Sequence, residues 1–170
     1  MTFAGTQIDA LSFAVLAFTT VQRLAELAIA RRNTARLLAQ GAVEIAPGHY
    51  PLIVGLHTAW LAGLWVLAPA IPISLPLLAV FAALQAARVW VLSTLGGRWT
   101  TRIIVLAGAP LVRTGPFRFV SHPNYLIVAG ELAVLPLAFG LTGFASIFTV
   151  LNALMMAIRI PAETKALHSS

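Results

Sequence analysis

The 170-residue chain contains no cysteine, which excludes disulfides, thiolate metal sites and cysteine nucleophiles. Acidic residues are also scarce, with five Asp and Glu against eleven Lys and Arg, and charged residues make up only 9% of the sequence. A soluble globular domain of this length needs more polar surface than this composition supplies. These shortages exclude the ordinary soluble fold classes.

Long apolar runs are what the chain has instead. Hydrophobic residues make up 59% of it, and its mean hydropathy is +0.91. Runs of bilayer-crossing length predict five helices, at about residues 8–30, 52–70, 73–95, 123–140 and 142–160. The last two are short and are joined by GLTG at 140–143, which predicts a tight hairpin. We therefore expect an all-α integral membrane protein with a single domain over residues 1–170.

The basic residues outside these apolar runs fall on one side of the predicted membrane. They follow the first, third and fifth helices, whereas the opposite loops at 68–74 and 140–143 contain no Lys or Arg. The positive-inside rule then places the N-terminus outside and the C-terminus in the cytoplasm. We expect no removable signal peptide, because the N-terminus lacks a basic segment and a small-residue cleavage site.

Several familiar kinds of site are poorly supported. His49 and His57 are eight residues apart, and His122 and His168 lie far from them, so the spacing does not predict a metal site. Asp9, the only aspartate, lies on the opposite side of the predicted membrane from the histidines, which disfavours a Ser/His/Asp triad. The net charge of +6 belongs to membrane-flanking positions and does not predict nucleic-acid binding.

Four charged residues fall inside or near the ends of the predicted helices. Arg23 and Glu26 are three apart on one helix and are expected to pair. Arg88 is expected to extend to the lipid headgroups. Glu131 lies deep in an apolar segment, so it must be protonated, paired or facing a wet pocket. A pocket role and a buried hydrogen bond to His57 or another helix both remain open for it.

The most informative stretch is RTGPFRFVSHPNYLIVAGE at residues 113–131. Its polar residues lie within a short loop that runs directly into an apolar helix: Arg113, Arg118, His122, Asn124 and Tyr125. Each such group must be solvated, paired or bound to a ligand. The stretch therefore predicts a site for a charged, polar cofactor at the membrane surface.

This stretch also carries a family resemblance. GPFRFVSHPNY, followed by the apolar hairpin and by RIPAE at 159–163 with Leu167, resembles the isoprenylcysteine carboxyl methyltransferase family of membrane enzymes. The segments RLAELAIARRNTARLLAQGAVE, HYPLIVGLH and RWTTRIIVLAGAPLVRTGPFRF resemble a bacterial subgroup associated with type III polyketide synthases and with O-methylation of alkylpyrone or alkylresorcinol lipids. Two positions depart from the family pattern, Ser121 where Arg is common and Thr164 where a second acid or amide is common.

The resemblance implies S-adenosylmethionine as methyl donor, a bacterial inner-membrane location, and a cytoplasmic cofactor site between the loop at 96–125 and a C-terminal arm at 159–170. The residues that match the family's cofactor-binding positions are His122, Pro123, Asn124, Tyr125, Arg159 and Glu163.

Methyl transfer needs no covalent enzyme intermediate, so catalysis rests on positioning and desolvation. An alkylpyrone enol is acidic enough to arrive largely as its anion, and a nearby cation would orient its oxygen. The loop arginines that are candidates for this task are Arg98, Arg102, Arg113 and Arg118. Of these we predict Arg102 and Arg118 as catalytic residues, together with Glu131.

Other functions stay open at this point. A prenylated cysteine carboxylate or a phospholipid amine is an alternative acceptor. A small transporter or a non-catalytic scaffold is the alternative of another class, although a transporter is expected to place its polar groups near the bilayer midplane. Membrane lipids and a lipophilic small molecule are the expected partners, nucleic acid is not, and the sequence does not indicate an oligomeric state.

Overall fold

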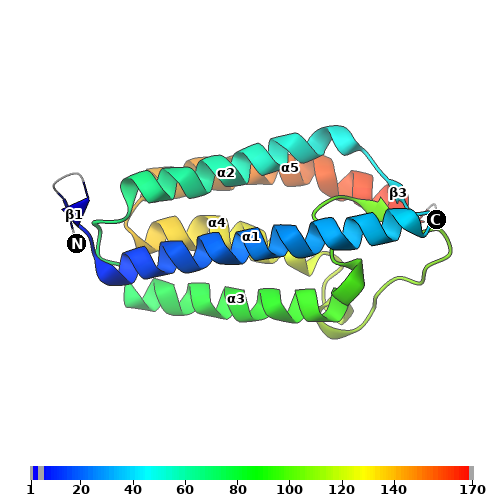
Figure 1. Ribbon diagram of the computed structural model, residues 1–170, viewed down its shortest axis with the longest axis horizontal. Coiled ribbons are helices and arrows are strands. Elements are labelled where there is room, and N and C mark those ends of the chain that lie inside the picture. The colour runs from blue at the N-terminus through cyan, green and yellow to red at the C-terminus, as the bar shows by residue number, and fades with distance from the viewer. Residues whose placement is uncertain (1, 4–5, 169–170) are drawn as a thin grey trace.

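Five α-helices run lengthwise along the molecule in the computed structural model, which describes residues 2–3 and 6–168 and the side chains of residues 8–166 (Figure 1). The helices are α1 (Ala10–Ala39), α2 (Tyr50–Leu67), α3 (Leu75–Leu95), α4 (Pro123–Ala138) and α5 (Thr142–His168). Among the described residues, four helices, α1, α2, α3 and α5, are long and apolar enough to cross a membrane. The expected helical membrane protein is confirmed at this level.

Two of the predicted helix ends were wrong. Helix α1 continues to Ala39 instead of ending near residue 30, and α5 has 27 residues and continues to His168 instead of ending near 160. Only α4, with 16 residues, is short, so the expected pair of short helices is not found. Hydropathy locates the end of an apolar run, but Arg, Lys and Glu are good helix formers and extend a helix beyond it. Residues 169–170 of the expected C-terminal arm lie outside the described residues.

The helix ends follow from local chemistry. Asp9 caps α1 by accepting a hydrogen bond from the Ser12 backbone N–H at 2.8 Å, and its hydrogen bonds to Ser12 lower the pKa of the Asp9 carboxyl. A proline occupies the first turn of α2, α3 and α4, where its missing N–H leaves no helical bond unmade. Gly140, with φ +71°, makes the turn between α4 and α5.

Short elements organise the two ends of the molecule. At the end where α1 finishes, strand β3 (Val43–Glu44) pairs antiparallel with β4 (Ile104–Val105) and ties the α1–α2 connection to the long loop after α3. Three 3₁₀ turns lie at this end, η1 (Pro47–His49), η2 (Gly96–Arg98) and η3 (Gly115–Arg118). At the opposite end, β1 (Thr2–Phe3) pairs antiparallel with β2 (Thr6–Gln7). Strands of two residues have no periodicity that the sequence alone reveals.

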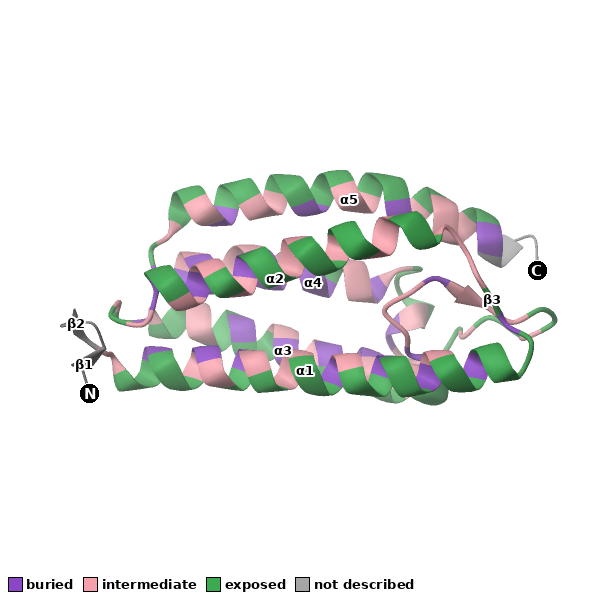
Figure 2. Ribbon diagram, turned by 45° about the horizontal axis from the view of Figure 1, so that its top comes forward, coloured by how far each residue is buried: buried purple, intermediate pink, exposed green. Residues whose placement is uncertain are grey.

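Helix α4 forms the centre of the bundle and packs most closely against α3 and α5. Its Leu132 and Leu135 are fully buried, together with Leu16 of α1 and Leu64 of α2. The outward faces of the helices are exposed along their length (Figure 2), and they carry large apolar side chains such as Val66, which is 80% exposed. Apolar outer faces are what a lipid environment requires of a membrane bundle.

A buried ion cluster joins α1, α3 and α4. We define it by Arg23 and Glu26 of α1, Arg88 of α3 and Glu131 of α4. The Arg88 Nε donates to Glu131 Oε1 at 2.8 Å, and an Arg23 N–H donates to Glu131 Oε2 at 2.5 Å. A second N–H of Arg88 donates to Glu26 at 3.1 Å, and the expected Arg23–Glu26 pair forms at 3.1 Å.

The ion cluster corrects the expectation for Arg88 and selects among the alternatives left open for Glu131. Arg88 is only 2% exposed, so it does not extend to the headgroups; two carboxylates inside the bundle provide partners for its guanidinium. Glu131 is fully buried and paired with two guanidinium groups. His57 bonds the Ile53 carbonyl through Nδ1 at 2.9 Å. Of the three alternatives for Glu131, pairing is the one that the structure shows.

Candidate cofactor pocket

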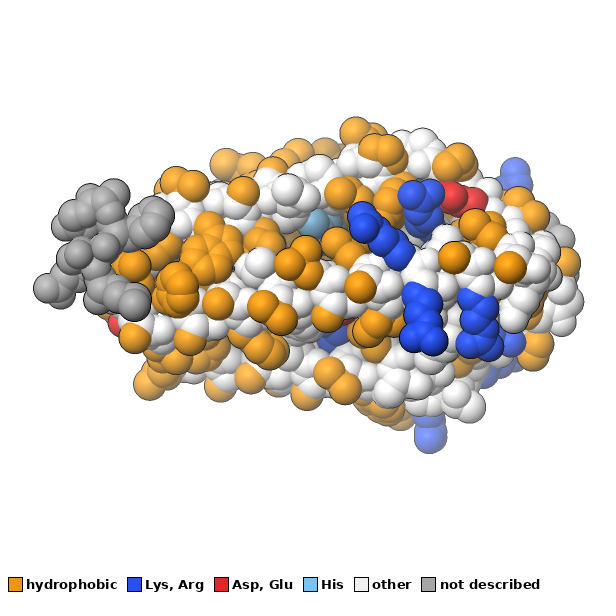
Figure 3. Space-filling model, in the orientation of Figure 1, with side chains coloured by type: hydrophobic (Ala, Val, Ile, Leu, Met, Phe, Trp, Pro, Cys, Tyr) orange, Lys and Arg blue, Asp and Glu red, His pale blue; other side chains and the backbone are white. Residues whose placement is uncertain are grey.

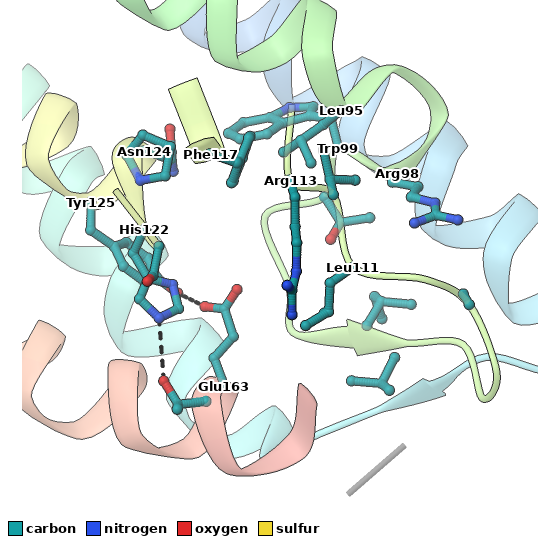
Figure 4. A pocket seen from close by; sticks show the side chains of 18 of the residues that line it. Leu95, Arg98, Trp99, Leu111, Arg113, Phe117, His122, Asn124, Tyr125 and Glu163 are labelled. Carbon is teal, nitrogen blue, oxygen red and sulfur yellow. Dashed lines mark hydrogen bonds between the residues drawn. The ribbon is translucent and has the colours of Figure 1, made fainter. Parts of the chain in front are cut away.

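A pocket of about 870 Å³ lies at the end of the molecule where α4 begins and α5 finishes. Its walls are the long loop after α3, the first turn of α4 and the last turns of α5 (Figure 4). Basic side chains gather toward the same end, whereas hydrophobic side chains are spread along the visible face (Figure 3). The volume lies within the range of roughly 300–1,000 Å³ that is typical of small-molecule sites.

The first turn of α4 supplies one polar group of pocket residues. Pro123 begins the helix, so His122, Asn124 and Tyr125 come to lie side by side at its start. The His122 ring stacks on the Tyr125 ring, with centroids 5.4 Å apart and an angle of 29° between the planes.

Hydrogen bonds connect this turn to α5. The Tyr125 hydroxyl donates to the Glu163 carboxylate, and Arg159 Nε donates to the Tyr125 oxygen at 2.9 Å. The His122 Nε2 lies 3.2 Å from the Thr164 hydroxyl. Arg159, buried at 9% exposure, also donates to a backbone carbonyl of the loop at 2.6 Å. We call the contacts among His122, Tyr125, Arg159, Glu163 and Thr164 the α4–α5 clasp; they join residues about 40 positions apart in the sequence.

Two buried polar atoms on the pocket-lining residues have no partner within the described part of the chain. They are the Oδ1 of Asn124 and the Nε1 of Trp99. An unsatisfied buried acceptor or donor costs about 1–3 kcal/mol. A polar ligand in the pocket would offer partners to such groups, so they are consistent with a binding site.

The structure brings all six predicted cofactor residues to the pocket wall, namely His122, Pro123, Asn124, Tyr125, Arg159 and Glu163. Both departures from the family pattern also lie there, since Ser121 lines the pocket and Thr164 contacts His122.

The three predicted catalytic residues are not brought together. Arg118 lines the pocket. Arg102 instead donates to Glu44 at 2.9 Å, with its guanidinium 4.3 Å from the centroid of the Tyr50 ring. Glu131 belongs to the ion cluster inside the bundle. Neither Arg102 nor Glu131 is among the residues that line the pocket.

Sequence reasoning missed Trp99 as a pocket residue. The chain turns sharply after α3 at Gly96, and Asn33 of α1 holds this turn by donating to the carbonyls of Gly96, at 3.1 Å, and Trp99, at 2.9 Å. These bonds cross more than 60 positions of sequence. No local pattern around Trp99 indicates them, because they depend on how α1 and α3 pack.

The fold and the pocket define a helical membrane protein with a partly polar pocket at its basic end. Residues 77–169 match the model of the isoprenylcysteine carboxyl methyltransferase (ICMT) family, and the chain belongs to that family. Members of the family are membrane methyltransferases that generally use S-adenosylmethionine. The matched segment contains every residue of the α4–α5 clasp.

A curated relative extends the similarity beyond the matched segment. The chain is 37% identical over 159 residues to a Bacillus subtilis (strain 168) protein described as "Uncharacterized protein YpbQ". The alignment covers 91% of this chain and 95% of the relative. No solved structure matches the chain.

Proposed function

We propose that this protein is an S-adenosylmethionine-dependent methyltransferase that O-methylates a lipophilic acceptor of the alkylpyrone or alkylresorcinol type. The observation that carries the proposal is the gathering of the six motif residues from α4 and α5 around one pocket. Family membership supports the methyltransferase class. The acceptor type rests on the resemblance of the N-terminal and loop segments to the bacterial subgroup.

The pocket residues fit the chemistry of S-adenosylmethionine. The molecule presents a sulfonium, an ammonium, a carboxylate, ribose hydroxyls and adenine. Glu163 offers a carboxylate to a cationic or hydroxyl group, and the unpartnered Asn124 oxygen offers an acceptor. The Tyr125 ring offers an aromatic face for a cation. We propose that the cofactor is held by His122, Pro123, Asn124, Tyr125, Arg159 and Glu163.

In this mechanism the protein positions the reactants. When bound at these residues, S-adenosylmethionine would supply a methyl group activated by its sulfonium, which would pass to the acceptor oxygen while the carbon–sulfur electron pair stays on sulfur. Arg159 and Glu163 set the position of Tyr125 from two sides, so the clasp fixes the polar wall before ligand arrives. Fixed groups orient a reactant at lower entropic cost than mobile ones.

The distribution of charge supports a cytoplasmic location for the pocket. Arg31, Arg32 and Arg36 lie in the last three turns of α1, and the loop after α3 carries four more arginines. The α2–α3 and α4–α5 connections at the opposite end contain none. We propose an N-terminus outside the bacterial inner membrane and a cytoplasmic pocket, following the positive-inside rule.

A second acceptor is favoured by the family itself. The family description names isoprenylcysteine carboxyl groups, so a prenylated cysteine carboxylate is the second candidate. Both acceptors join an apolar chain to an oxygen nucleophile, and the same cofactor site would serve either.

Calorimetric titration of the purified protein with S-adenosylmethionine and S-adenosylhomocysteine tests the proposal. We expect saturable binding, weakened about 10- to 100-fold in Glu163→Gln, because a hydrogen bond to a charged group contributes about 1.5–3 kcal/mol. Glu44→Gln is the matched control, since it removes a carboxylate paired with Arg102 outside the pocket. No binding to a folded, lipid-supplemented wild type would reject the methyltransferase proposal. Equal binding by Glu163→Gln would reject the role of Glu163.

A further inference from the structure

The two walls of the pocket differ in chemistry. The α4–α5 wall is rich in hydrogen-bonding groups. The opposite wall, formed by the loop after α3, presents mainly apolar side chains: Ile104, Val105, Leu106, Leu111, Val112 and Phe117. Arg113 extends from this loop into the space that Glu163 enters from the other side (Figure 4). A wall of this kind suits an amphiphile with one anionic group rather than a molecule that is polar throughout.

The arginines of the loop after α3 differ in the groups that their guanidiniums contact. Arg98 points away from the pocket centre (Figure 4) and donates to the Pro110 carbonyl at 2.5 Å. Arg102 is paired with Glu44. Arg118 lies over the exposed Phe119 ring, 4.8 Å from its centroid.

Arg113 lines the pocket and, within the part of the chain that the structure describes, has no hydrogen-bond or ion-pair partner. Its guanidinium is a permanent cation with donors arranged to hold an anionic oxygen. Arg113 is exposed, so this guanidinium is accessible from the open side of the pocket. The cation is therefore available to a ligand on the loop side.

We propose that Arg113 selects the acceptor by binding an oxygen that is already ionised, so that the enzyme prefers amphiphiles with an acidic enol over those with an ordinary phenol. This inference rests on the proposed function. An arginine that requires an ionised oxygen would distinguish alkylpyrones from alkylresorcinols. A 4-hydroxypyrone is largely an anion at neutral pH, whereas a resorcinol hydroxyl is not, because it resembles the Tyr phenol, whose pKa is near 10.

An ionised acceptor also removes the need for a general base. The side chains best suited to take a proton are already engaged, with His122 directed to Thr164 and Glu163 accepting from Tyr125. When the oxygen arrives as its anion, its lone pair forms the carbon–oxygen bond and no proton has to leave. Arg113 then needs only to hold the oxygen in place, which a fixed cation does.

The test measures binding of two probes to the full-length protein saturated with S-adenosylhomocysteine, in nanodiscs. The probes are 6-undecyl-4-hydroxy-2-pyrone and 5-undecylresorcinol, which share the alkyl chain and differ in the acidity of the hydroxyl. We expect the wild type to prefer the pyrone. In Arg113→Gln, pyrone affinity should fall about 10- to 100-fold, as for a lost charge-assisted hydrogen bond. Resorcinol and S-adenosylhomocysteine affinity should be unchanged, and Arg113→Lys should recover part of the loss.

Arg32→Gln is the matched control, because it removes the same charge from the same end of the molecule, while Arg32 lies exposed on α1 and does not line the pocket. The wild-type preference should also disappear when the pH falls low enough to protonate the pyrone, whereas Arg113→Gln should show little pH dependence. Methyl transfer to the pyrone, measured separately, should fall together with pyrone affinity.

Three results would overturn the inference. One is equal affinity of the wild type for both probes, and another is loss of the preference in Arg118→Gln with retention in Arg113→Gln. The third is loss of S-adenosylhomocysteine binding in Arg113→Gln, which would show that this arginine holds the cofactor carboxylate. If the wild type binds no S-adenosylhomocysteine, the proposed function itself fails, and this is seen before any variant is compared.

Discussion

The ion cluster and the α4–α5 clasp both contain guanidinium and carboxylate side chains, but the ion cluster lies inside the bundle whereas the clasp lies at the wall of a pocket. In the ion cluster, Glu131 accepts directly from Arg88 and Arg23, and its side chain is fully buried. In the clasp, the Tyr125 hydroxyl stands between a guanidinium and the carboxylate of Glu163, and that carboxylate lines a pocket.

The difference indicates which cluster serves the fold and which is available to a ligand. Both Glu131 oxygens are occupied, because Gln85 and Arg88 donate to one while Arg23 and Arg88 donate to the other. A buried charge that is fully paired avoids the cost of an isolated ion and holds its helices in register. Unpartnered buried polar atoms occur at both places among the described residues, on Asn124 and Trp99 at the pocket and on Arg23 Nε in the ion cluster. What distinguishes the clasp is that its Glu163 lines the pocket, where a polar ligand would reach it.

Breaking the ion cluster should have the largest effect on stability. Glu131→Ala leaves the buried guanidinium of Arg88 and the partly buried guanidinium of Arg23 without this partner, and removing one member of a buried pair costs about 3–5 kcal/mol. We expect a large drop in the midpoint of thermal unfolding in detergent. The double variant Glu131→Leu/Arg88→Leu should recover part of this loss, because it removes a charge of each sign. A wild-type midpoint in Glu131→Ala would contradict a structural role.

The geometry of the pocket loop is the next most sensitive feature. Gly115 has φ +56°, and a Cβ there would lie 2.5 Å from the Thr94 hydroxyl of α3. Gly115→Ala should therefore cost about 1–2 kcal/mol from the left-handed backbone alone and weaken S-adenosylhomocysteine binding as the loop shifts. Gly108→Ala is the control, since Gly108 has φ +73° but open space around its Cβ position. Equal effects of the two variants would show that the contact with α3 does not matter.

A smaller effect on stability should come from removing the Tyr125 hydroxyl, which lies between Arg159 and Glu163 in the clasp. Tyr125→Phe keeps the ring that stacks on His122 but removes the hydroxyl between Arg159 and Glu163. The hydroxyl positions Glu163 and Arg159 and is not itself required to bind the cofactor, so the effect on affinity is indirect, and we expect a roughly fivefold loss of S-adenosylmethionine affinity by calorimetry, about 1 kcal/mol. The unfolding midpoint should change far less than in Glu131→Ala. A larger drop of the unfolding midpoint in Tyr125→Phe than in Glu131→Ala would contradict the assignment of the ion cluster to stability and of the clasp to binding.

The smallest effect should come from Asp9, the acidic cap at the end far from both clusters. Its hydrogen bonds to Ser12 lower its pKa from 3.8, so the charged form stabilises the fold above pH 3.8 and the benefit is lost as the pH falls below it. The difference in unfolding midpoint between wild type and Asp9→Asn should shrink on acidification through that range. Cofactor binding at neutral pH should be the same in both proteins, and a change would link this end to the pocket.

The residues predicted to bind the cofactor lie together at the pocket, whereas the residues predicted as catalytic do not. His122, Asn124 and Tyr125 are neighbours in sequence at a helix start, so local geometry alone places them together. The positions of the Arg102 and Glu131 side chains depend on partners that are distant in the sequence. Glu44 pairs with Arg102 through the β3–β4 contact, and Glu131 meets charges on two other helices. Nothing near either residue in the sequence indicates those partners.

By itself, the amino-acid sequence determined that this is a helical membrane protein with basic residues at one end, because apolar runs and charge placement act locally on insertion and helix formation. It also determined the motif that identifies the family. Only the tertiary structure decided that Arg88 and Glu131 pair inside the bundle, that α5 brings Glu163 to Tyr125, and that Arg113 lacks a hydrogen-bond or ion-pair partner within the described part of the chain. Those outcomes depend on helices packing side by side, and the energy of a buried charge is set by neighbours that the chain supplies from far away.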